Sequence, residues 1–280
     1  MKVLKLKNRT VKTDLPAFVM GIVNCTPDSF YKNSRMNADQ ALKLIDEGAD
    51  ILDIGGESTR PDSVYVDEEE EIKRIIPVIK EIRKHSDIPV SVDTRKKSVF
   101  KAAVECGADM LNDISALEDD RDMADYVSQA ECSVVLMHKR GSPLTMQKNT
   151  QYKDVFSQVN DYLGKRVSYA LSRGIKKDKI ILDPGIGFGK GLKENKTLIA
   201  RCGELCNKEY PVLMALSRKS CIGEMTGSCI DDRLYGTLAA DMIAVLKGAF
   251  MLRVHDVKAC CDTLKVLKSF MDSGLLSDLL

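Results

Sequence analysis

Residues 89–113 read PVSVDTRKKSVFKAAVECGADMLND, and this stretch contains one repeat of the pattern that decides the fold. The apolar runs at 89–93 and 110–112 are too short for helices, whereas 95–105 between them has the period of a helix. A strand, a helix and a second strand in this order are typical of parallel sheets, because a parallel connection has to cross back over the sheet. The pattern therefore predicts a β-α-β unit.

The same alternation recurs eight times along the 280 residues. Eight such units, without a linker rich in Pro, Gly or Ser, favour a closed α/β barrel, the (β/α)8 TIM barrel, and a single domain over 1–280. A doubly wound open sheet is the alternative, because the sequence does not show closure. The expected strands are 18–24, 51–54, 89–93, 110–112, 133–137, 180–183, 212–216 and 249–253, and the expected helices include 38–47, 68–84, 95–105, 154–172, 232–247 and 257–271.

Residues 1–17 precede the first expected strand. Alternating Val3, Leu4, Leu6 and Val11 predict an N-terminal β-hairpin, which we expect to cover the bottom of the barrel. Lys and Arg interrupt every apolar stretch at this end of the chain, so the sequence predicts neither a secretory signal nor a membrane span.

Composition argues against several classes of protein. Forty-two Lys and Arg against 41 Asp and Glu leave a net charge of +1, without the basic excess of a dedicated nucleic-acid binder. Nine cysteines without a Cys-x-x-Cys pair argue against a disulfide framework and a zinc ribbon, and they predict a cytoplasmic location. Three histidines make a multi-histidine metal centre unexpected, whereas a magnesium site made of oxygen ligands fits this composition.

Every expected strand ends on hydrogen-bonding or charged residues, at the edge where barrels of this kind have their active sites. Taken singly, several of them have a structural explanation. Asp93 is suited to cap the next helix, Asn112 and Asp113 to form a turn, and Asp183 to form an Asx turn. Taken together, Asp93, Asn112 and Asp183 offer donors and acceptors for a polar heterocycle.

Two clusters of cations are harder to explain by structure alone. Residues 217–220 (SRKS) follow the seventh strand, where barrels commonly bind anions through loop amides and a helix N-terminus. Arg253 and His255 follow the eighth strand two residues apart, a spacing that aims both side chains the same way. We therefore expect Lys219, Arg253 and His255 to clamp a phosphate or diphosphate from a solvent-facing rim.

Eight sequence motifs closely resemble those of the dihydropteroate synthases. They occur in the family's order and span nearly the whole chain: MGIVNCTPDSF at 20–30, DIGGESTRP at 53–61, SVDT at 91–94, ND at 112–113, LMHKRG at 136–141, LDPGIGFGK at 182–190, SRKS at 217–220 and RVHD at 253–256. The resemblance implies a pterin-binding barrel that joins 6-hydroxymethyl-7,8-dihydropterin diphosphate to 4-aminobenzoate in folate synthesis. The resemblance further implies 7,8-dihydropteroate and diphosphate as products and Mg²⁺ as cofactor.

The resemblance also implies residue roles by motif position, with Lys219, Arg253 and His255 as the catalytic residues. The pterin site comprises Asp93, Asn112, Met137, Asp183 and Lys219. The diphosphate site comprises Asn24, Thr59, Arg253 and His255, and Asn24 also binds the metal. The 4-aminobenzoate pocket comprises Phe30, Arg60, Pro61, Phe188 and Ser220. A homodimer through the later helices is implied too, with small-molecule substrates and no membrane partner.

At two positions a lysine departs from the family pattern. Lys32 stands where an acidic residue is usual, and Lys139 stands where Met is frequent. Three alternative functions stay open. The first is a related methyltransferase that moves a methyl group to a corrinoid, and the second is an aldolase with Lys219 as Schiff-base lysine. The third is a non-catalytic pterin-binding relative, which the Lys32 departure permits.

Overall fold

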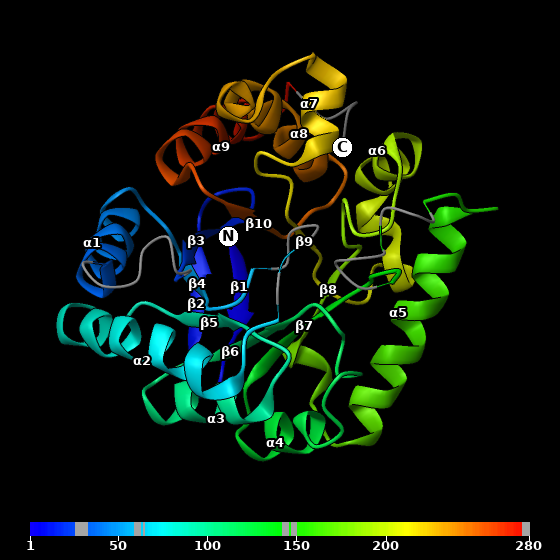
Figure 1. Ribbon diagram of the computed structural model, residues 1–280. Helices are drawn as coiled ribbons and strands as arrows, with labels where there is room; N and C mark the ends of the chain where they lie inside the picture. Colours follow the sequence, from blue (N-terminus) through cyan, green and yellow to red (C-terminus); the bar gives the residue numbers. More distant parts are fainter. Residues whose placement is uncertain (26–32, 59–62, 64, 142–145, 147–149, 276–280) are drawn as a thin grey trace.

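The computed structural model describes residues 1–25, 33–58, 63, 65–141, 146 and 150–275. Within these ranges, short strands occupy the centre and helices surround them (Figure 1). The strands of the central sheet are β3 (Phe18–Asn24), β4 (Ile51–Gly55), β5 (Val90–Asp93), β6 (Met110–Asp113), β7 (Ser133–Met137), β8 (Ile180–Asp183), β9 (Leu213–Met214) and β10 (Met251–Val254).

The eight strands pair in parallel in the order β8-β7-β6-β5-β4-β3-β10-β9. A parallel bridge between Leu182 of β8 and Val212, the residue before β9, joins the two ends of this sheet. The predicted (β/α)8 barrel is therefore confirmed, and the doubly wound alternative is wrong. In a barrel, every strand directs its carboxyl end to the same opening.

The helices lie outside the barrel (Figure 1). Among the described residues, α4 and α6 were not among the helices expected from the sequence, and α1 begins five residues before the expected one. The α-helices are α1 (Asn33–Asp46), α2 (Glu68–His85), α3 (Lys97–Glu105), α4 (Met123–Gln129), α5 (Val155–Ser172), α6 (Leu192–Ala200), α7 (Ser220–Thr226), α8 (Leu234–Leu246) and α9 (Val257–Asp272). Short 3₁₀ turns occupy Lys177–Lys179 and Ile230–Asp232, and the segment Cys202–Lys208 has 3₁₀ turns interrupted by a kink at 205–207.

The N-terminal hairpin consists of β1 (Lys2–Lys5) and β2 (Thr10–Thr13), which pair antiparallel. Leu4 and Leu6 belong to the same apolar cluster as the interior-facing barrel residues Phe18, Met110 and Met251. The hairpin therefore closes the end of the barrel opposite the strand carboxyl ends, as predicted. Removing these two leucines from water contributes about 2 kcal/mol each to folding.

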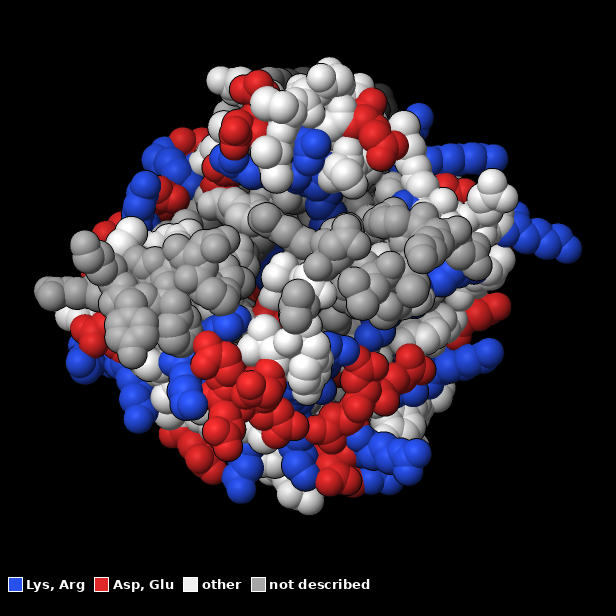
Figure 2. All heavy atoms as spheres, in the orientation of Figure 1, with Lys and Arg blue, Asp and Glu red and all other residues white. Residues whose placement is uncertain are grey.

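Residues 67–71 (DEEEE) form an acidic run at the start of α2, and most of them have the structural role expected of charges in a first helical turn. Asp67 caps the helix, because its carboxylate accepts a hydrogen bond from the Glu70 backbone N–H at 2.8 Å. Glu68 and Glu69 are exposed beside the positive end of the helix dipole. Glu71 differs, since it is buried and ion-paired with Lys96 at 2.5 Å. Figure 2, drawn in the orientation of Figure 1, shows acidic side chains gathered below the centre of the molecule.

Of the helices in the described ranges, none has both the length and the apolar character needed to span a bilayer.

The hairpin generates a stability prediction. Leu6 is 2% exposed, so Leu6→Ala should leave a cavity and lower the free energy of unfolding by about 2–5 kcal/mol. Val3 on the same hairpin is 45% exposed, and Val3→Ala should change it by less than about 0.5 kcal/mol. Urea denaturation of both variants checks this. Equal stability of the two would show that the hairpin does not close the core.

Candidate functional site

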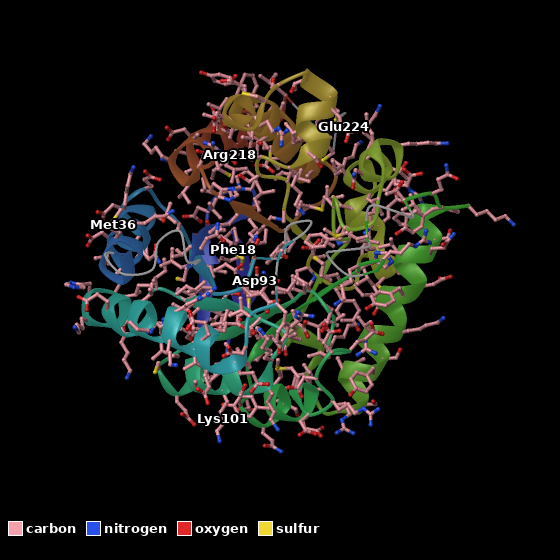
Figure 3. All side chains as sticks on the ribbon, in the orientation of Figure 1. Phe18, Met36, Asp93, Lys101, Arg218 and Glu224 are labelled. Carbon is pink, nitrogen blue, oxygen red and sulfur yellow. The ribbon has the colours of Figure 1, made fainter. Side chains whose placement is uncertain are left out.

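A cavity of about 1170 Å³ opens at the carboxyl ends of the strands. Its lining comes from the loops after most of the strands, although these residues are far apart in the sequence. Ten residues predicted for the site line this one cavity: Asn24, Asp93, Asn112, Met137, Asp183, Phe188, Lys219, Ser220, Arg253 and His255. Figure 3 shows Asp93 near the centre of the ring of helices, whereas Lys101 and Glu224 lie toward its outside.

The remaining predicted residues of the site, Phe30, Thr59, Arg60 and Pro61, lie outside the described residues, as does Lys32. Lys139, the other departure from the family pattern, is described. Its Nζ pairs with the Asp119 carboxylate at 3.1 Å.

Arg253 does not sit on a solvent-facing rim, and that expectation is wrong. Its side chain is 18% exposed, and its guanidinium binds two carboxylates. Nε donates to Oδ2 of Asp53 at 2.5 Å, and Nη2 donates to Oδ2 of Asp93 at 2.8 Å. The physical reason is that burying an isolated cation is costly, so a guanidinium inside the barrel is held by paired carboxylates.

Asp53, which binds Arg253, was assigned no role from the sequence. It is fully buried in the middle of β4, and Oδ2 also accepts a hydrogen bond from Asn112 Nδ2 at 3.0 Å. Its Oδ1 is buried without a hydrogen-bond partner among the described residues. The signal in the sequence was a carboxylate within the apolar run at 51–54, where a charge needs a buried partner.

Burial shifts the pKa values of the ionisable groups in the cavity. Burial raises the pKa of Asp93 to about 7, and the charge of Arg253 opposes this increase. Burial also raises the pKa of Asp183, against the effect of Lys219. The pKa of Lys219 is lowered by burial to about 8, against the effect of Asp183. Perturbed groups gathered in one cavity are typical of a functional site.

Asn112 and Asp113 have different surroundings. Both were possible turn formers from the sequence, and Asn112 alone was expected in the site. Asp113 accepts hydrogen bonds from the backbone and hydroxyl of Ser115 and from the Leu117 N–H, at 2.6–2.7 Å. It is therefore the turn former of the pair. Asn112 lines the cavity instead. Asp183 combines the two functions, since its Oδ1 accepts from the Gly185 N–H at 2.6 Å and it also lines the cavity.

Lys219 lies over the ring of Phe188, with its Nζ 4.9 Å from the ring centroid. The same Nζ donates a hydrogen bond to the Ile186 carbonyl. Because Ile186 and Phe188 follow β8 and Lys219 follows β9, these contacts hold two neighbouring loops together at one side of the cavity. A cation over an aromatic face contributes about 0.5–2 kcal/mol.

The two cation-bearing motifs are bonded to each other. Ser217 Oγ accepts from the His255 backbone N–H at 3.1 Å and lies 2.9 Å from His255 Nδ1. When the Ser217 hydroxyl donates to Nδ1, a neutral His255 carries its proton on Nε2, the form that donates to a phosphate oxygen. Arg218, which has a left-handed φ of 57°, forms a two-bond pair with Asp256 at 2.8 and 2.9 Å.

Asn24 is the predicted metal ligand of this site. It ends β3, is exposed and lines the cavity. Among the described residues, His, Cys, Asp and Glu form no cluster of three or more that could hold a metal. The amide oxygen of Asn24 fits Mg²⁺, which typically takes one or two protein oxygens and completes its shell with water and phosphate oxygens.

The sequence and the fold match those of known proteins over nearly the whole chain. The family model described as "Pterin binding enzyme" matches residues 20–255. The dihydropteroate synthase of Haemophilus influenzae is 44% identical over 268 residues, which are 94% of this chain and 97% of the relative. Two solved structures of the Xanthomonas albilineans dihydropteroate synthase, each covering 96% of this chain and 98% of the other, are similar as well. The one with 4-aminobenzoic acid is 42% identical with a TM-score of 0.89, and the one with 7,8-dihydropteroate is 39% identical with a TM-score of 0.86.

The ion pairs of Arg253 generate a pH prediction. Arg253→Met removes the charge that opposes burial, so the pKa of Asp93 should rise above its value of about 7. Because this pKa exceeds the ordinary value of 3.8, Asp93 destabilises the folded state as pH rises from that value to about 7. A ¹³C NMR titration of the carboxylates checks the shift. Arg253→Lys keeps the charge and should shift it less, whereas an unchanged Asp93 titration in Arg253→Met would refute the coupling.

Proposed function

We propose that this chain carries out the reaction of its family in this cavity. The chain belongs to the dihydropteroate synthase family of pterin-binding enzymes. The reaction joins 6-hydroxymethyl-7,8-dihydropterin diphosphate to 4-aminobenzoate and yields 7,8-dihydropteroate and diphosphate. Family membership decides against the corrinoid methyltransferase and the Schiff-base aldolase. The observation that carries the assignment of roles is the convergence of ten predicted residues on one cavity.

The pterin binds at the deeper end of the cavity, against Asp93, Asn112, Met137, Asp183 and Lys219. This proposal is supported by the chemistry of the side chains, because a pterin edge alternates N–H donors with nitrogen and oxygen acceptors. Carboxylates accept from the donors, and the Asn112 amide and the Lys219 ammonium donate to the acceptors. The Met137 side chain, 3% exposed, provides a polarizable surface for the flat ring.

The diphosphate binds Asn24, Thr59, Arg253 and His255. Arg253 and His255 come from the end of β10 and face the cavity, which supports a site for negative charge there. When Mg²⁺ is bound through Asn24, it neutralises part of the charge of the diphosphate leaving group. Two cationic or donor side chains at the same end add to that stabilisation as the charge develops.

The 4-aminobenzoate binds in a pocket formed by Phe30, Arg60, Pro61, Phe188 and Ser220. Among the described residues, this pocket is supported by the contact of Phe188 with Lys219, which places an aromatic ring beside a cation. The ring of the substrate then packs against apolar atoms, and its carboxylate faces donors.

The reaction breaks one bond and forms one. The C–O bond of the exocyclic methylene breaks and the diphosphate leaves with the electron pair, while positive charge develops on the carbon attached to the pterin. The carboxylates of Asp93 and Asp183 stabilise that charge, and Arg253 and His255 stabilise the leaving group. The amine of 4-aminobenzoate forms the C–N bond, and the resulting anilinium loses its proton to water. The chain therefore needs no strong general base.

We also propose that residues 1–280 form one pterin-binding domain, with 1–17 as its hairpin, and that the protein is cytoplasmic. All nine cysteines are free, which supports a reducing compartment. A homodimer through the later helices is supported by exposed apolar side chains: Tyr235, Met242 and Ile243 on α8, and Val266 and Phe270 on α9.

The activity has a direct test. Diphosphate should be released only when the pterin diphosphate, 4-aminobenzoate and Mg²⁺ are all present. Lys219→Ala should lower kcat/KM by about 10²–10³-fold, because the ammonium is lost from the cavity. Lys101 lies on the outside, on α3, and Lys101→Ala is the matched control, with wild-type kinetics expected (Figure 3). Pterin binding without turnover would instead identify a non-catalytic relative.

The dimer has a separate test. Ile243→Glu places a charge on the exposed apolar face of α8, so it should convert a dimer into monomers in sedimentation equilibrium. Met36→Glu, at an exposed apolar position on α1, should leave the dimer intact (Figure 3). A monomeric wild-type protein at micromolar concentration would rule the homodimer out.

A further inference from the structure

Lys190 is a buried lysine bonded to two loops whose residues line the cavity, and the reaction described above does not use it. It follows β8 and is 3% exposed. Its Nζ donates to three backbone carbonyls, those of Gly185 at 2.8 Å, Phe188 at 3.0 Å and His138 at 3.3 Å. Within the described part of the chain, the hydrogen bonds of its Nζ all go to these backbone carbonyls. Its partners are therefore the backbones of two loops.

The three carbonyls indicate the protonation state of this amine. Each carbonyl is an acceptor, so the amine has to supply three N–H groups, and only the ammonium form has three. Burial lowers the pKa of Lys190 well below its ordinary value, and the charges of Lys219 and Arg140 act in the same direction, so the ammonium form depends on the nearby carboxylate of Asp183 and on the three carbonyls. Burying a cation is costly, and an apolar side chain of the same length would avoid that cost. The ammonium is therefore expected to do something that an apolar residue cannot.

The bonded carbonyls belong to the loops that carry proposed substrate residues. His138 directly follows Met137, at the end of β7. Gly185 lies two residues after Asp183 and bonds to its side chain, and Phe188 faces the cavity. One ammonium thus joins the loop of Met137 to the loop that bears both Asp183 and Phe188.

The same two loops approach each other more closely than side chains would allow. A Cβ added to Gly185, where φ is +69°, would lie 1.9 Å from the His138 carbonyl oxygen. A Cβ added to Gly189 would lie 2.6 Å from the Arg140 carbonyl oxygen. With backbones packed this closely, carbonyl oxygens of both loops converge, and a donor placed among them keeps them from repelling one another.

A second side chain, Asn195 at the start of α6, holds the same loop from another direction. Its Oδ1 accepts from the Gly187 N–H at 2.8 Å, and its Nδ2 donates to the Lys190 carbonyl at 3.2 Å. Asn195 is 3% exposed. The glycine-rich segment is thus fixed at its start, middle and end by buried polar side chains.

We propose that Lys190 is a positioning residue for the reaction: its ammonium group binds the loops after β7 and β8 together and so sets where Asp183 and Phe188 meet the two substrates. The proposal rests on the roles proposed for these two residues. Lys190 itself touches neither substrate.

The chain contains a matched control at the other end of the barrel. Lys179 is also buried, at 9% exposure, and its Nζ donates to the carbonyls of Leu6 and Lys7. It joins β8 to the N-terminal hairpin as Lys190 joins two loops, with backbone carbonyls as its acceptors. It differs from Lys190 in having two carbonyl acceptors instead of three and in lying at the amino ends of the strands, away from the cavity.

The experiment compares Lys190→Met with Lys179→Met. Both variants should lose thermal stability, because each removes a buried ammonium from its carbonyls. Lys190→Met should also lower kcat/KM by about 10²-fold and raise the KM for 4-aminobenzoate, because displaced groups at a reacting centre carry such a cost. Lys179→Met should keep wild-type kcat and KM at temperatures where it is folded. Wild-type kinetics in Lys190→Met, or equal kinetic losses in both variants, would overturn the proposal.

A second variant keeps the test decisive if Lys190→Met does not fold. Asn195→Ala releases Gly187 while leaving the ammonium in place, and it should raise the KM for 4-aminobenzoate in the same direction. An unchanged KM in this variant contradicts the proposal. Calorimetric titration with the pterin diphosphate separates the two hypotheses, because binding needs no turnover. A wild-type protein that releases no diphosphate would defeat the proposed function. With an active wild type, displacement of Asp183 should weaken pterin binding in Lys190→Met, and unchanged pterin affinity together with an unchanged KM in the variants that fold would defeat the role of Lys190.

Discussion

The guanidinium of Arg253 between the carboxylates of Asp53 and Asp93 is the interaction on which the site depends. The three residues come from β10, β4 and β5, and β3 lies between β10 and β4 in the sheet. Strands of a closed parallel barrel are buried on both faces, so charges can enter the interior only where they are paired. This pairing connects the proposed pterin residues to the proposed diphosphate residues, because Asn112 bonds to the same Asp53 oxygen as Arg253 does.

Most of the barrel could be predicted because its strands are apolar runs with polar ends. Strands 18–24, 133–137 and 180–183 were predicted to the residue, since a polar residue ends each apolar run: Asn24, His138 or Asp183. The expected strand 212–216 is reduced to Leu213–Met214 plus one bridge. Closure of the barrel depends on that bridge between distant residues, and no local pattern carries such information. The helices α4 and α6 were missed because seven and nine residues give few repeats of a helical period. Although α3 has nine residues as well, its buried residues are all apolar, whereas α6 also buries the polar Asn195.

Residues of the candidate site could be predicted where their position at the end of a strand marked them. Polar residues at strand ends did converge on one cavity, but the pair Asn112 and Asp113 was ambiguous, because both have turn-forming side chains. The alternation of side chains along β6 separates them in three dimensions. Asp53 was missed because it lies within its strand, and its significance depends on Arg253, 200 positions away. The burial of Arg253 was missed for the same reason, since its partners are distant in sequence.

Lys190 and Lys179 show how one kind of interaction has different consequences at the two ends of a barrel. Both are buried ammonium groups held by backbone carbonyls rather than by carboxylates. In this fold, the amino ends of the strands contribute stability, whereas the loops at the carboxyl ends contribute chemistry. A loop at the chemical end has little apolar area of its own to hold it in place, and glycines make it easier to deform. A central donor that satisfies several carbonyls at once gives such a loop one geometry. The charge buried at Lys190 therefore fits a requirement for precision near Asp183, and the charge at Lys179 fits a requirement for closing the core.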